Sequence, residues 1–313
     1  MRIIKDDITK LNNTVVTLGK FDGNHIGHRA LFEEAKKIKN DSKEPLYTVI
    51  FTFDINPRRI VSGKDTDTLY TNAERMSIES AHGMDCCLIW PFTKENMATE
   101  PEDFVKDVLS ERLGVRHIVV GEDFRFGRER RGDVSLLFEL GEKYGFKVHA
   151  LKKVMYKDEA VSSTRIKGEI AKGNLEDANF MLGAPFMVTG KVAQGKHLGR
   201  TLGFPTVNLN VPKGKSLPPD GVYATMTSVS NEKYMSMSNI GTRPTFDDGP
   251  GRNIETNIFD FEGDLYGETV KIEFYRFIRP ERHFENAGAL AGELKENKEQ
   301  IKAYFLGNGK YQQ

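Results

Sequence analysis

With 313 residues, the chain is long enough for one large domain or two of ordinary size. Its 45 basic and 45 acidic residues cancel to a formal net charge of zero, which gives no support to a nucleic-acid or anionic-membrane partner. The sequence shows neither a signal segment nor a bilayer-spanning stretch, so we expect a cytoplasmic protein. Weak homo-oligomer formation is compatible with the sequence.

In residues 1–185, short apolar runs alternate with helical patterns. The apolar runs fall at 15–18, 46–53, 86–90, 117–120 and 146–151. The helical patterns fall at 29–39, 72–82, 101–113 and 134–144. Such alternation predicts a parallel sheet with helices on both faces, whose ligands bind beyond the carboxyl ends of the strands.

The two cysteines, Cys86 and Cys87, are adjacent in one apolar run. Neighbouring side chains on a strand point to opposite faces of the sheet, so a mutual disulfide is not expected. We predict two reduced core residues, in keeping with a cytoplasmic protein.

A glycine-rich turn, residues 17–28, follows the first apolar run and opens the first helical pattern. Backbone N–H groups and the helix dipole favour a phosphate at such a turn, and His25 and His28 are spaced to stabilise its negative charge. Two simpler interpretations are a tight glycine turn and a histidine metal pair, although no third metal ligand is obvious nearby.

Three further polar stretches in this half are candidates for ligand contacts. Residues 52–57 (TFDINP) follow the second run, residues 120–133 interleave phenylalanines with charges, and residues 161–167 open a helix. The simpler interpretations are a proline-closed turn, a solvated loop and a helix N-cap. Hydroxyls and cations at a helix start, as at Ser162 to Arg165, also suit a triphosphate.

From residue 187 the periodicity changes. Short runs fall at 187–192, 221–228, 234–240, 253–261 and 270–278, and a helical pattern at 287–305 ends the chain. We predict a small antiparallel β-barrel with a C-terminal helix, and a domain boundary after residue 185. A long glycine-bearing loop spans residues 190–208, and Thr206 and Asn208 share one face of a strand.

These motifs together resemble the bacterial bifunctional riboflavin kinase/FAD synthetase family. GKFDGNHIGH (19–28) resembles the HxGH signature of adenylyltransferases in its FMN-specific form, and residues 190–208 resemble the riboflavin kinase signature. The resemblance covers nearly the whole chain. It implies a Rossmann-like nucleotidyltransferase domain in 1–185 and an all-β kinase barrel in 186–313. It also implies phosphorylation of riboflavin to FMN, then adenylylation of FMN to FAD with release of pyrophosphate, using ATP and Mg²⁺.

The resemblance assigns roles to individual residues, with only small molecules as partners. Catalytic roles are implied for His25 and His28 in adenylyl transfer and for Glu255 as the kinase base. Implied ATP contacts of the adenylyltransferase are Gly19, Phe21, Gly27, Ser162, Ser163, Thr164 and Arg165. Implied ATP contacts of the kinase are Gly195, Lys196, Gly199, Arg200 and Thr206. Implied flavin contacts are Asp54, Asn56, Asp123, Phe124 and Arg279, and implied metal ligands are Thr206 and Asn208.

The sequence departs from the family's motifs at Ile55, Asn56, Lys167 and Asn257. These departures leave open a paralogue with only one of the two activities. A non-catalytic flavin-sensing regulator is opposed by the intact histidine pair and Glu255. An adenylyltransferase for a nicotinamide or pantetheine phosphate is opposed by the C-terminal half.

Overall fold

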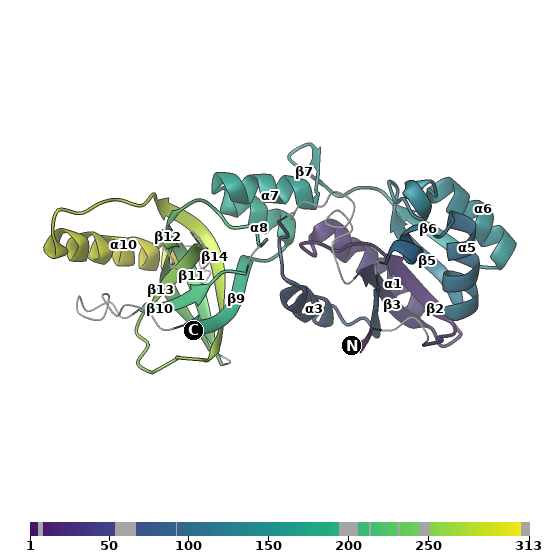
Figure 1. Ribbon diagram of the computed structural model, residues 1–313, viewed down its shortest axis with the longest axis horizontal. Helices are drawn as coiled ribbons and strands as arrows, with labels where there is room; N and C mark the ends of the chain where they lie inside the picture. The colour runs from purple at the N-terminus through teal and green to yellow at the C-terminus, as the bar shows by residue number, and fades with distance from the viewer. Residues whose placement is uncertain are drawn as a thin grey trace. The chain divides into compact units, whose positions relative to one another are not determined.

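The computed structural model describes residues 1–5, 9–53, 67–91, 93–193, 206–212, 214–230, 232–243 and 251–307 (Figure 1). The chain forms two compact units. The first contains Met1–Thr68 and Asn72–Ser163, and the second contains Leu69–Thr71 and Thr164–Gln313. Two helices between residues 163 and 182 thus group with the second unit, and a boundary after residue 185 stays a prediction.

The first unit is built on a six-stranded sheet in which every neighbouring pair is parallel. Its strands are β1 (Arg2–Ile4), β2 (Thr14–Leu18), β3 (Tyr47–Phe53), β4 (Cys86–Trp90), β5 (Val115–Gly121) and β6 (Lys147–Leu151). The spatial order is β1-β4-β3-β2-β5-β6, so the direction of winding reverses between β2 and β5. The predicted parallel α/β sheet is confirmed, and ligands of such sheets bind where the order reverses.

Helices cover both faces of this sheet. The helices α1 (Ile26–Asp41) and α3 (Asn72–Ser80) pack on one face. On the other face lie the short α4 (Lys94–Met97), α5 (Pro101–Asp103), which continues as a π-helix over Phe104–Arg112, and α6 (Val134–Tyr144). Cys86 belongs to the second of these cores and Cys87 to the first, and both are buried free thiols, as the sequence predicts. A small hairpin, β7 (Met155–Tyr156) and β8 (Glu159–Ala160), completes the unit.

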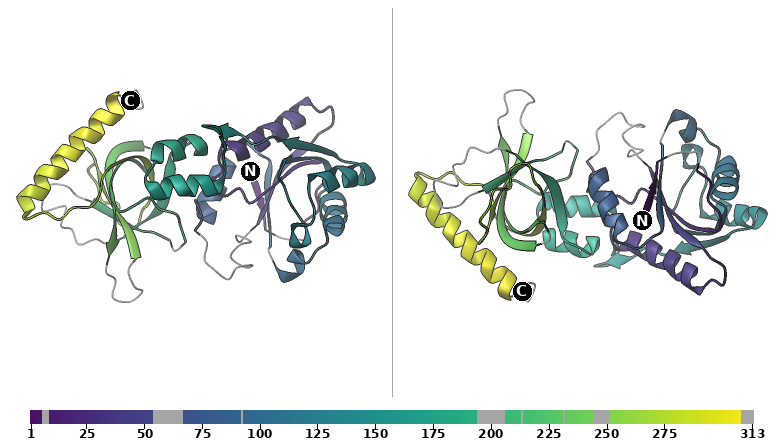
Figure 2. Two further views of the ribbon diagram at one scale, coloured as in Figure 1. Left: turned by 90° about the horizontal axis from the view of Figure 1, so that it is seen from above. Right: turned by 90° about the horizontal axis from the view of Figure 1, so that it is seen from below.

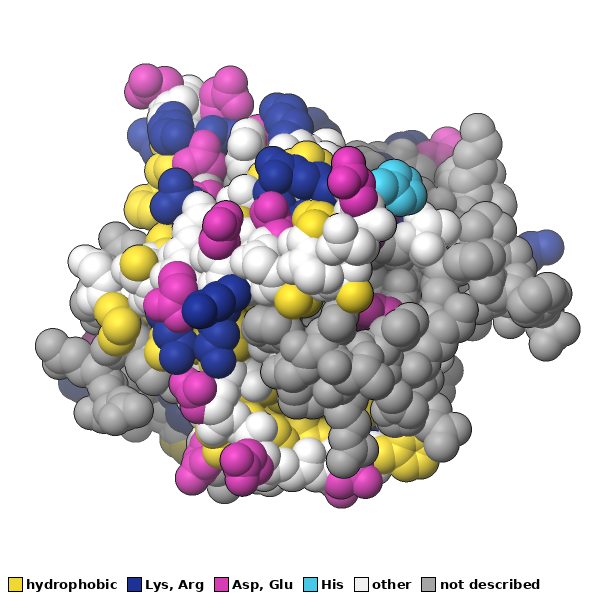
Figure 3. All heavy atoms as spheres, turned by 90° about the vertical axis from the view of Figure 1, so that its left-hand side faces the viewer, with side chains coloured by type: hydrophobic (Ala, Val, Ile, Leu, Met, Phe, Trp, Pro, Cys, Tyr) yellow, Lys and Arg dark blue, Asp and Glu magenta, His cyan; other side chains and the backbone are white. Residues whose placement is uncertain are grey.

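The second unit is a closed antiparallel barrel preceded by α7 (Ser163–Lys172) and α8 (Leu175–Leu182). Its strands are β9 (Phe186–Ala193), β10 (Thr206–Asn210), β11 (Gly221–Val229), β12 (Glu232–Arg243), β13 (Gly251–Ile258) and β14 (Thr269–Arg279). Figures 1 and 2 show α10 (Ala287–Gly307) lying along the outside of the barrel, as predicted. On the face of this unit seen in Figure 3, acidic and basic side chains are interspersed.

The interior of the barrel contains a ladder of hydroxyl groups. Thr225 Oγ1 lies 2.9 Å from both Ser236 Oγ and Ser238 Oγ, and Ser238 Oγ lies 2.7 Å from Thr256 Oγ1. A further pair, Thr227 with Ser236, extends the ladder at 2.8 Å, and none of the five side chains is accessible to solvent. Buried polar atoms are tolerated when they are hydrogen-bonded, so the ladder satisfies the polar atoms within the barrel.

A three-residue piece of the N-terminal half, Leu69–Thr71, belongs to the barrel unit. The buried Lys215 donates a hydrogen bond of 3.0 Å from Nζ to the carbonyl of Leu69. Its ammonium also lies 5.0 Å from the ring centres of Tyr70 and Phe186, within cation–π distance. The second unit is therefore assembled from two stretches of chain that are distant in sequence.

Replacing Ser238 by Ala should destabilise the barrel, because Thr225 and Thr256 each lose a buried hydrogen-bond partner. The expected cost is about 1–3 kcal/mol of unfolding free energy. Calorimetric or denaturant unfolding measures it, with Ser77→Ala at an exposed site of α3 as the control. Equal stability of the two variants would show that the ladder contributes nothing.

Candidate functional site

The turn between β2 and α1 has an unusual backbone. Phe21, Gly23 and Asn24 all have positive φ angles, of 48°, 91° and 44°. Such angles are uncommon for phenylalanine and asparagine and are often found at functional sites. A Cβ atom on Gly19 would lie 2.9 Å from Cζ of the buried Phe21 ring, so a glycine is needed for that ring to pack under the turn.

His25 and His28 stack on each other at the start of α1. Their ring centres are 3.6 Å apart and their planes differ by 18°. His25 is the N-cap of the helix, and its Nδ1 accepts a hydrogen bond of 3.3 Å from the backbone N–H of His28. Since Nδ1 is the acceptor, the neutral ring carries its proton on Nε2. A Cβ atom on Gly27 would lie 3.1 Å from the His25 ring, which explains the glycine between the histidines.

Burial keeps both imidazoles neutral. It lowers the pKa of His25 from 6.5 to about 4, although the Asp22 carboxylate acts in the opposite direction. Burial and the neighbouring His25 lower the pKa of His28 well below its usual range. At neutral pH the pair therefore offers N–H donors rather than positive charges, and donors of this kind stabilise a developing negative charge without reorganisation.

The predicted Ser162–Arg165 segment reaches this turn at one point. The Ser163 hydroxyl donates a hydrogen bond of 2.7 Å to the backbone carbonyl of Asp22. Ser163, the last residue of the first unit, is also the first residue of α7. Thr164 and Arg165 belong to the second unit, and their contact with ATP stays a prediction.

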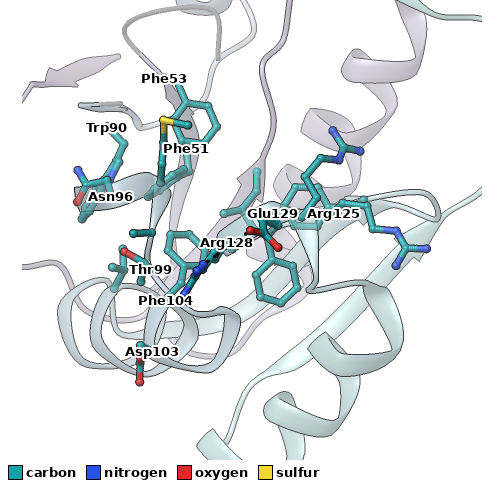
Figure 4. Close-up of a pocket in the computed structure, with 18 of the residues that line it drawn as sticks. Phe51, Phe53, Trp90, Asn96, Thr99, Asp103, Phe104, Arg125, Arg128 and Glu129 are labelled. Carbon is teal, nitrogen blue, oxygen red and sulfur yellow. Dashed lines mark ion pairs between the residues drawn. The ribbon is translucent and has the colours of Figure 1, made fainter. Parts of the chain in front are cut away.

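A pocket of about 990 Å³ lies on the face of the sheet covered by the π-helix (Figure 4). Its volume is within the usual range for small-molecule sites. Aromatic rings from several elements line it: Phe51, Phe53, Trp90, Phe104, Phe124 and Phe126. Gly19 and Lys20 line it too, so the pocket meets the histidine turn at the end of β2. Flat aromatic walls of this kind suit a planar aromatic ligand.

The two flavin contacts predicted after β5 have different surroundings. Phe124 lines the pocket and stacks on Phe126, with ring centres 5.8 Å apart and planes that differ by 13°. Asp123 is exposed and pairs with Lys153 Nζ at 2.9 Å. The geometry therefore supports stacking by Phe124 more directly than a contact from Asp123.

The barrel brings the described kinase residues together on one face. In the antiparallel pairing of β10 with β13, Thr206 lies opposite Asn257 and Asn208 lies opposite Glu255. Directly opposed residues share a face of the sheet. This face points out of the barrel, since Asn257 also pairs with Met237, which packs in the α10 core. Asn208 Oδ1 is buried and has no hydrogen-bond partner among the described residues, so an oxygen ligand is available beside Glu255.

Arg279, at the end of β14, anchors α10. Its Nε lies 2.9 Å from Asn297 Oδ1 and 2.8 Å from Glu293 Oε1, and its side chain is 9% exposed. These bonds tie the C-terminal helix to the barrel. A direct flavin contact by Arg279 stays a prediction.

Several predicted residues lie outside the described ranges: Asp54, Asn56, Gly195, Lys196, Gly199 and Arg200. Within the described ranges, no group of three or more His, Cys, Asp or Glu side chains is placed to hold a metal ion. No helix in those ranges is long and apolar enough to cross a bilayer.

The sequence of each half matches a known domain family. The FAD synthetase family matches residues 7–165 and the riboflavin kinase family matches residues 182–305. The bifunctional riboflavin kinase/FMN adenylyltransferase of Buchnera aphidicola subsp. Schizaphis graminum is 33% identical over 97% of this chain and 99% of its own. Its namesake from Listeria monocytogenes is 34% identical over 97% of this chain and 96% of its own. The chain belongs to the bifunctional riboflavin kinase/FMN adenylyltransferase family.

A solved structure shares the fold of this chain over nearly its whole length. It is described as a macrolide-efflux protein from Streptococcus pneumoniae, is 30% identical, and superposes with a TM-score of 0.87 over 96% of this chain and 99% of its own.

Sequence reasoning missed some of the residues that line the aromatic pocket in the first unit. Phe51, Trp90 and Phe104 line the pocket, but they lie in runs that read as ordinary core strands and a helix. Arg75 and Glu79 of α3 are buried at the same edge of the sheet. Their spacing of four residues on a helix is also typical of an exposed ion pair, so no signal in the sequence singles them out.

The low pKa of His25 predicts a loss of stability in acid. Between pH 6.5 and pH 4 the unfolded chain binds a proton at His25 that the folded chain does not, so stability falls as the pH falls through this window. The full loss from this group is about 3 kcal/mol. NMR titration of the His25 ring protons should give a midpoint near 4, and denaturant unfolding of the wild type and His25→Gln at several pH values gives the energy. A midpoint near 6.5 would contradict the burial argument.

Replacing Gly27 by Ala should displace the His25 ring without destabilising the protein. The new methyl group would meet that ring at 3.1 Å, whereas alanine within a helix is favoured over glycine by about 1 kcal/mol. We expect an unchanged or higher melting temperature together with a raised pKa of His25. Gly292→Ala on α10 is the control, because a Cβ there meets nothing within 4 Å.

Proposed function

We propose that this chain makes FAD from riboflavin in two ATP-dependent steps. The barrel unit phosphorylates riboflavin to FMN, and the first unit adenylylates FMN to FAD and releases pyrophosphate. The observation that carries the proposal is the neutral, stacked histidine pair at the end of β2, next to an aromatic pocket that begins at Gly19 and Lys20. The names of the curated relatives support the same pair of activities.

In adenylyl transfer, an ionised oxygen of the FMN phosphate attacks the α-phosphorus of ATP. The new P–O bond forms as the bond to the pyrophosphate oxygen breaks. The attacking oxygen is already ionised at neutral pH, so the site must position the reactants and stabilise charge rather than remove a proton. In this proposal, Nε2–H of His25, His28 and the N–H groups at the start of α1 donate hydrogen bonds to the phosphate oxygens.

The remaining groups of the first site divide between the two substrates. Gly19, Phe21 and Gly27 shape the turn so that its backbone can approach ATP. Ser162, Ser163, Thr164 and Arg165 supply hydroxyls and a cation for the outer phosphates. The isoalloxazine ring of FMN occupies the aromatic pocket against Phe124, with Asp123, Asp54 and Asn56 as the polar contacts.

In the kinase step, the Glu255 carboxylate accepts the proton of the ribityl 5′-hydroxyl as that oxygen attacks the γ-phosphorus, and ADP leaves. Thr206 and Asn208 would hold Mg²⁺, which neutralises the phosphate charge when bound. The donor set fits, because Mg²⁺ prefers oxygen ligands and Asn208 Oδ1 lacks a partner in the described part of the chain. Gly195, Lys196, Gly199 and Arg200 bind the ADP phosphates, and Arg279 acts near the flavin ring. A cytoplasmic location with only small-molecule partners belongs to the same proposal.

Two variants separate the activities. Purified protein is incubated with ATP, Mg²⁺ and either riboflavin or FMN, and the flavins are separated over time. Glu255→Gln should lower FMN formation from riboflavin by about 100- to 10,000-fold and leave FAD formation from added FMN unchanged. His25→Asn should do the converse, with FAD formation lowered by about 100- to 1,000-fold.

The outcomes distinguish the alternatives. A wild-type protein that converts only one substrate would restrict the proposal to one unit. Conversion of neither substrate would overturn the proposal that the protein is an enzyme and would favour a flavin sensor. A sensor would keep its response to flavin in the Glu255→Gln variant. Removal of Mg²⁺ by a chelator should stop FMN formation.

A further inference from the structure

Arg75 and Glu79, one helical turn apart on α3, are among the few charged side chains buried in the first unit. Their exposed fractions are 9% and 0%. Burying a charge is costly unless it is paired and hydrogen-bonded. The pair therefore has to be held in place by specific partners, and these partners lie at the adenylyltransferase site.

Arg75 joins the carboxyl ends of β2 and β3. Its guanidinium donates to the carbonyl of Lys20 at 3.0 Å, to Thr52 Oγ1 at 3.2 Å and to the carbonyl of Phe53 at 2.9 Å. Lys20 lies in the histidine turn, and both Lys20 and Phe53 line the aromatic pocket. The guanidinium group of Arg75 thus connects the turn that carries His25 with the residues of β3 that line the pocket. The fork geometry of arginine allows such simultaneous bonds.

Glu79 orients Arg75 from behind. Its Oε1 lies 3.7 Å from Arg75 Nε, and its Oε2 accepts a hydrogen bond of 3.4 Å from the Cys87 thiol. Burial raises the pKa of Glu79, while the Arg75 charge and the hydrogen bond from Cys87 act against that rise. The carboxylate is thus hydrogen-bonded by the Cys87 thiol of β4 on one side. On the other side it is paired with Arg75 by charge alone, because Arg75 Nε and Glu79 Oε1 are too far apart for a hydrogen bond.

A similar charged cluster at the opposite edge of the sheet provides a comparison. Asp85 accepts hydrogen bonds from Lys39 Nζ at 2.6 Å and from the backbone N–H of Thr48 at 2.8 Å. Asp85 directly precedes β4 and Thr48 lies near the start of β3, so this cluster joins the amino ends of the strands. It holds the same sheet together without touching the pocket or the histidine turn.

We propose that Arg75 and Glu79 are positioning residues for FMN adenylylation. They hold the histidine turn and the flavin pocket in one fixed relation, so that the FMN phosphate and the α-phosphorus of ATP meet in line. This proposal rests on the function proposed above for the first unit. Arg75 contacts neither substrate itself and acts through the carbonyls of Lys20 and Phe53.

The test compares four variants in both reactions: Arg75→Met, Arg75→Lys, Glu79→Gln and Asp85→Asn. Arg75→Met should lower kcat for FMN adenylylation by about 10- to 100-fold with KM values within about threefold, since small misplacements mainly cost the transition state. Arg75→Lys should recover part of this loss, and Glu79→Gln should show a smaller loss of about threefold to tenfold. Riboflavin phosphorylation in the same molecule serves as an internal control and should be unchanged.

The control for general destabilisation is Asp85→Asn. It should lower the melting temperature and leave kcat for adenylylation within about twofold. An unchanged kcat in Arg75→Met, or an equal loss in Asp85→Asn, would overturn the proposal. If Arg75→Met does not fold, and so also loses kinase activity, the Arg75→Lys and Glu79→Gln kinetics decide.

A second measurement separates this proposal from the proposed function. If the turn loosens, His25 becomes more hydrated, and its pKa should rise from about 4 toward 6.5 in Arg75→Met but not in Asp85→Asn. This NMR titration requires no turnover. If the wild type forms no FAD but the pKa of His25 still rises in Arg75→Met, only the proposed activity is rejected. If the pKa of His25 is the same in Arg75→Met as in the wild type, the positioning role is rejected.

Discussion

Where the strand order of the first unit reverses, the chain leaves the neighbouring strands β2 and β5 toward opposite faces of the sheet, and the rest of the site depends on this arrangement. The histidine turn leaves the end of β2 and the Phe124 loop leaves the end of β5. Helix α1, which follows β2, and helix α6, which follows β5, cover opposite faces of the sheet. The topology of the sheet alone therefore creates a cavity between these loops. The sequence has to supply only the aromatic side chains that line the cavity and the hydrogen-bond donors beside it.

The histidine pair illustrates how packing decides chemistry. Two imidazoles stacked at 3.6 Å could not both carry a positive charge without strong repulsion, and burial disfavours even one charge. The protein thereby keeps two donors that do not bind phosphate as fixed cations would. Neutral donors bind an anionic product less tightly than positive charges would. In the adenylyl transfer proposed above, this weaker binding favours the release of pyrophosphate.

The parts of this structure that were predictable are those with a local signal. Periodicity placed the parallel sheet and the barrel, and the glycines and histidines of residues 17–28 marked the turn before α1, whose role in phosphate binding stays a prediction. β1 was not predicted, because a three-residue strand beside polar neighbours has no measurable period. The sequence also could not explain why residue 27 is a glycine. The explanation is that the His25 ring lies close to the position that a Cβ atom of residue 27 would occupy. Arg75 shows the same limit, because its acceptors are carbonyls, which every residue has.

The grouping of Leu69–Thr71 with the barrel has an evolutionary consequence. Two domains joined end to end can be exchanged between proteins by a single recombination event in the linker. Here such an exchange at residue 163 would separate Lys215 from the Leu69 carbonyl and the Tyr70 ring. A transplanted barrel would then lack the Leu69 carbonyl that accepts a hydrogen bond from the buried Lys215 ammonium. The two halves of this gene are therefore expected to be inherited together, rather than reshuffled as independent cassettes.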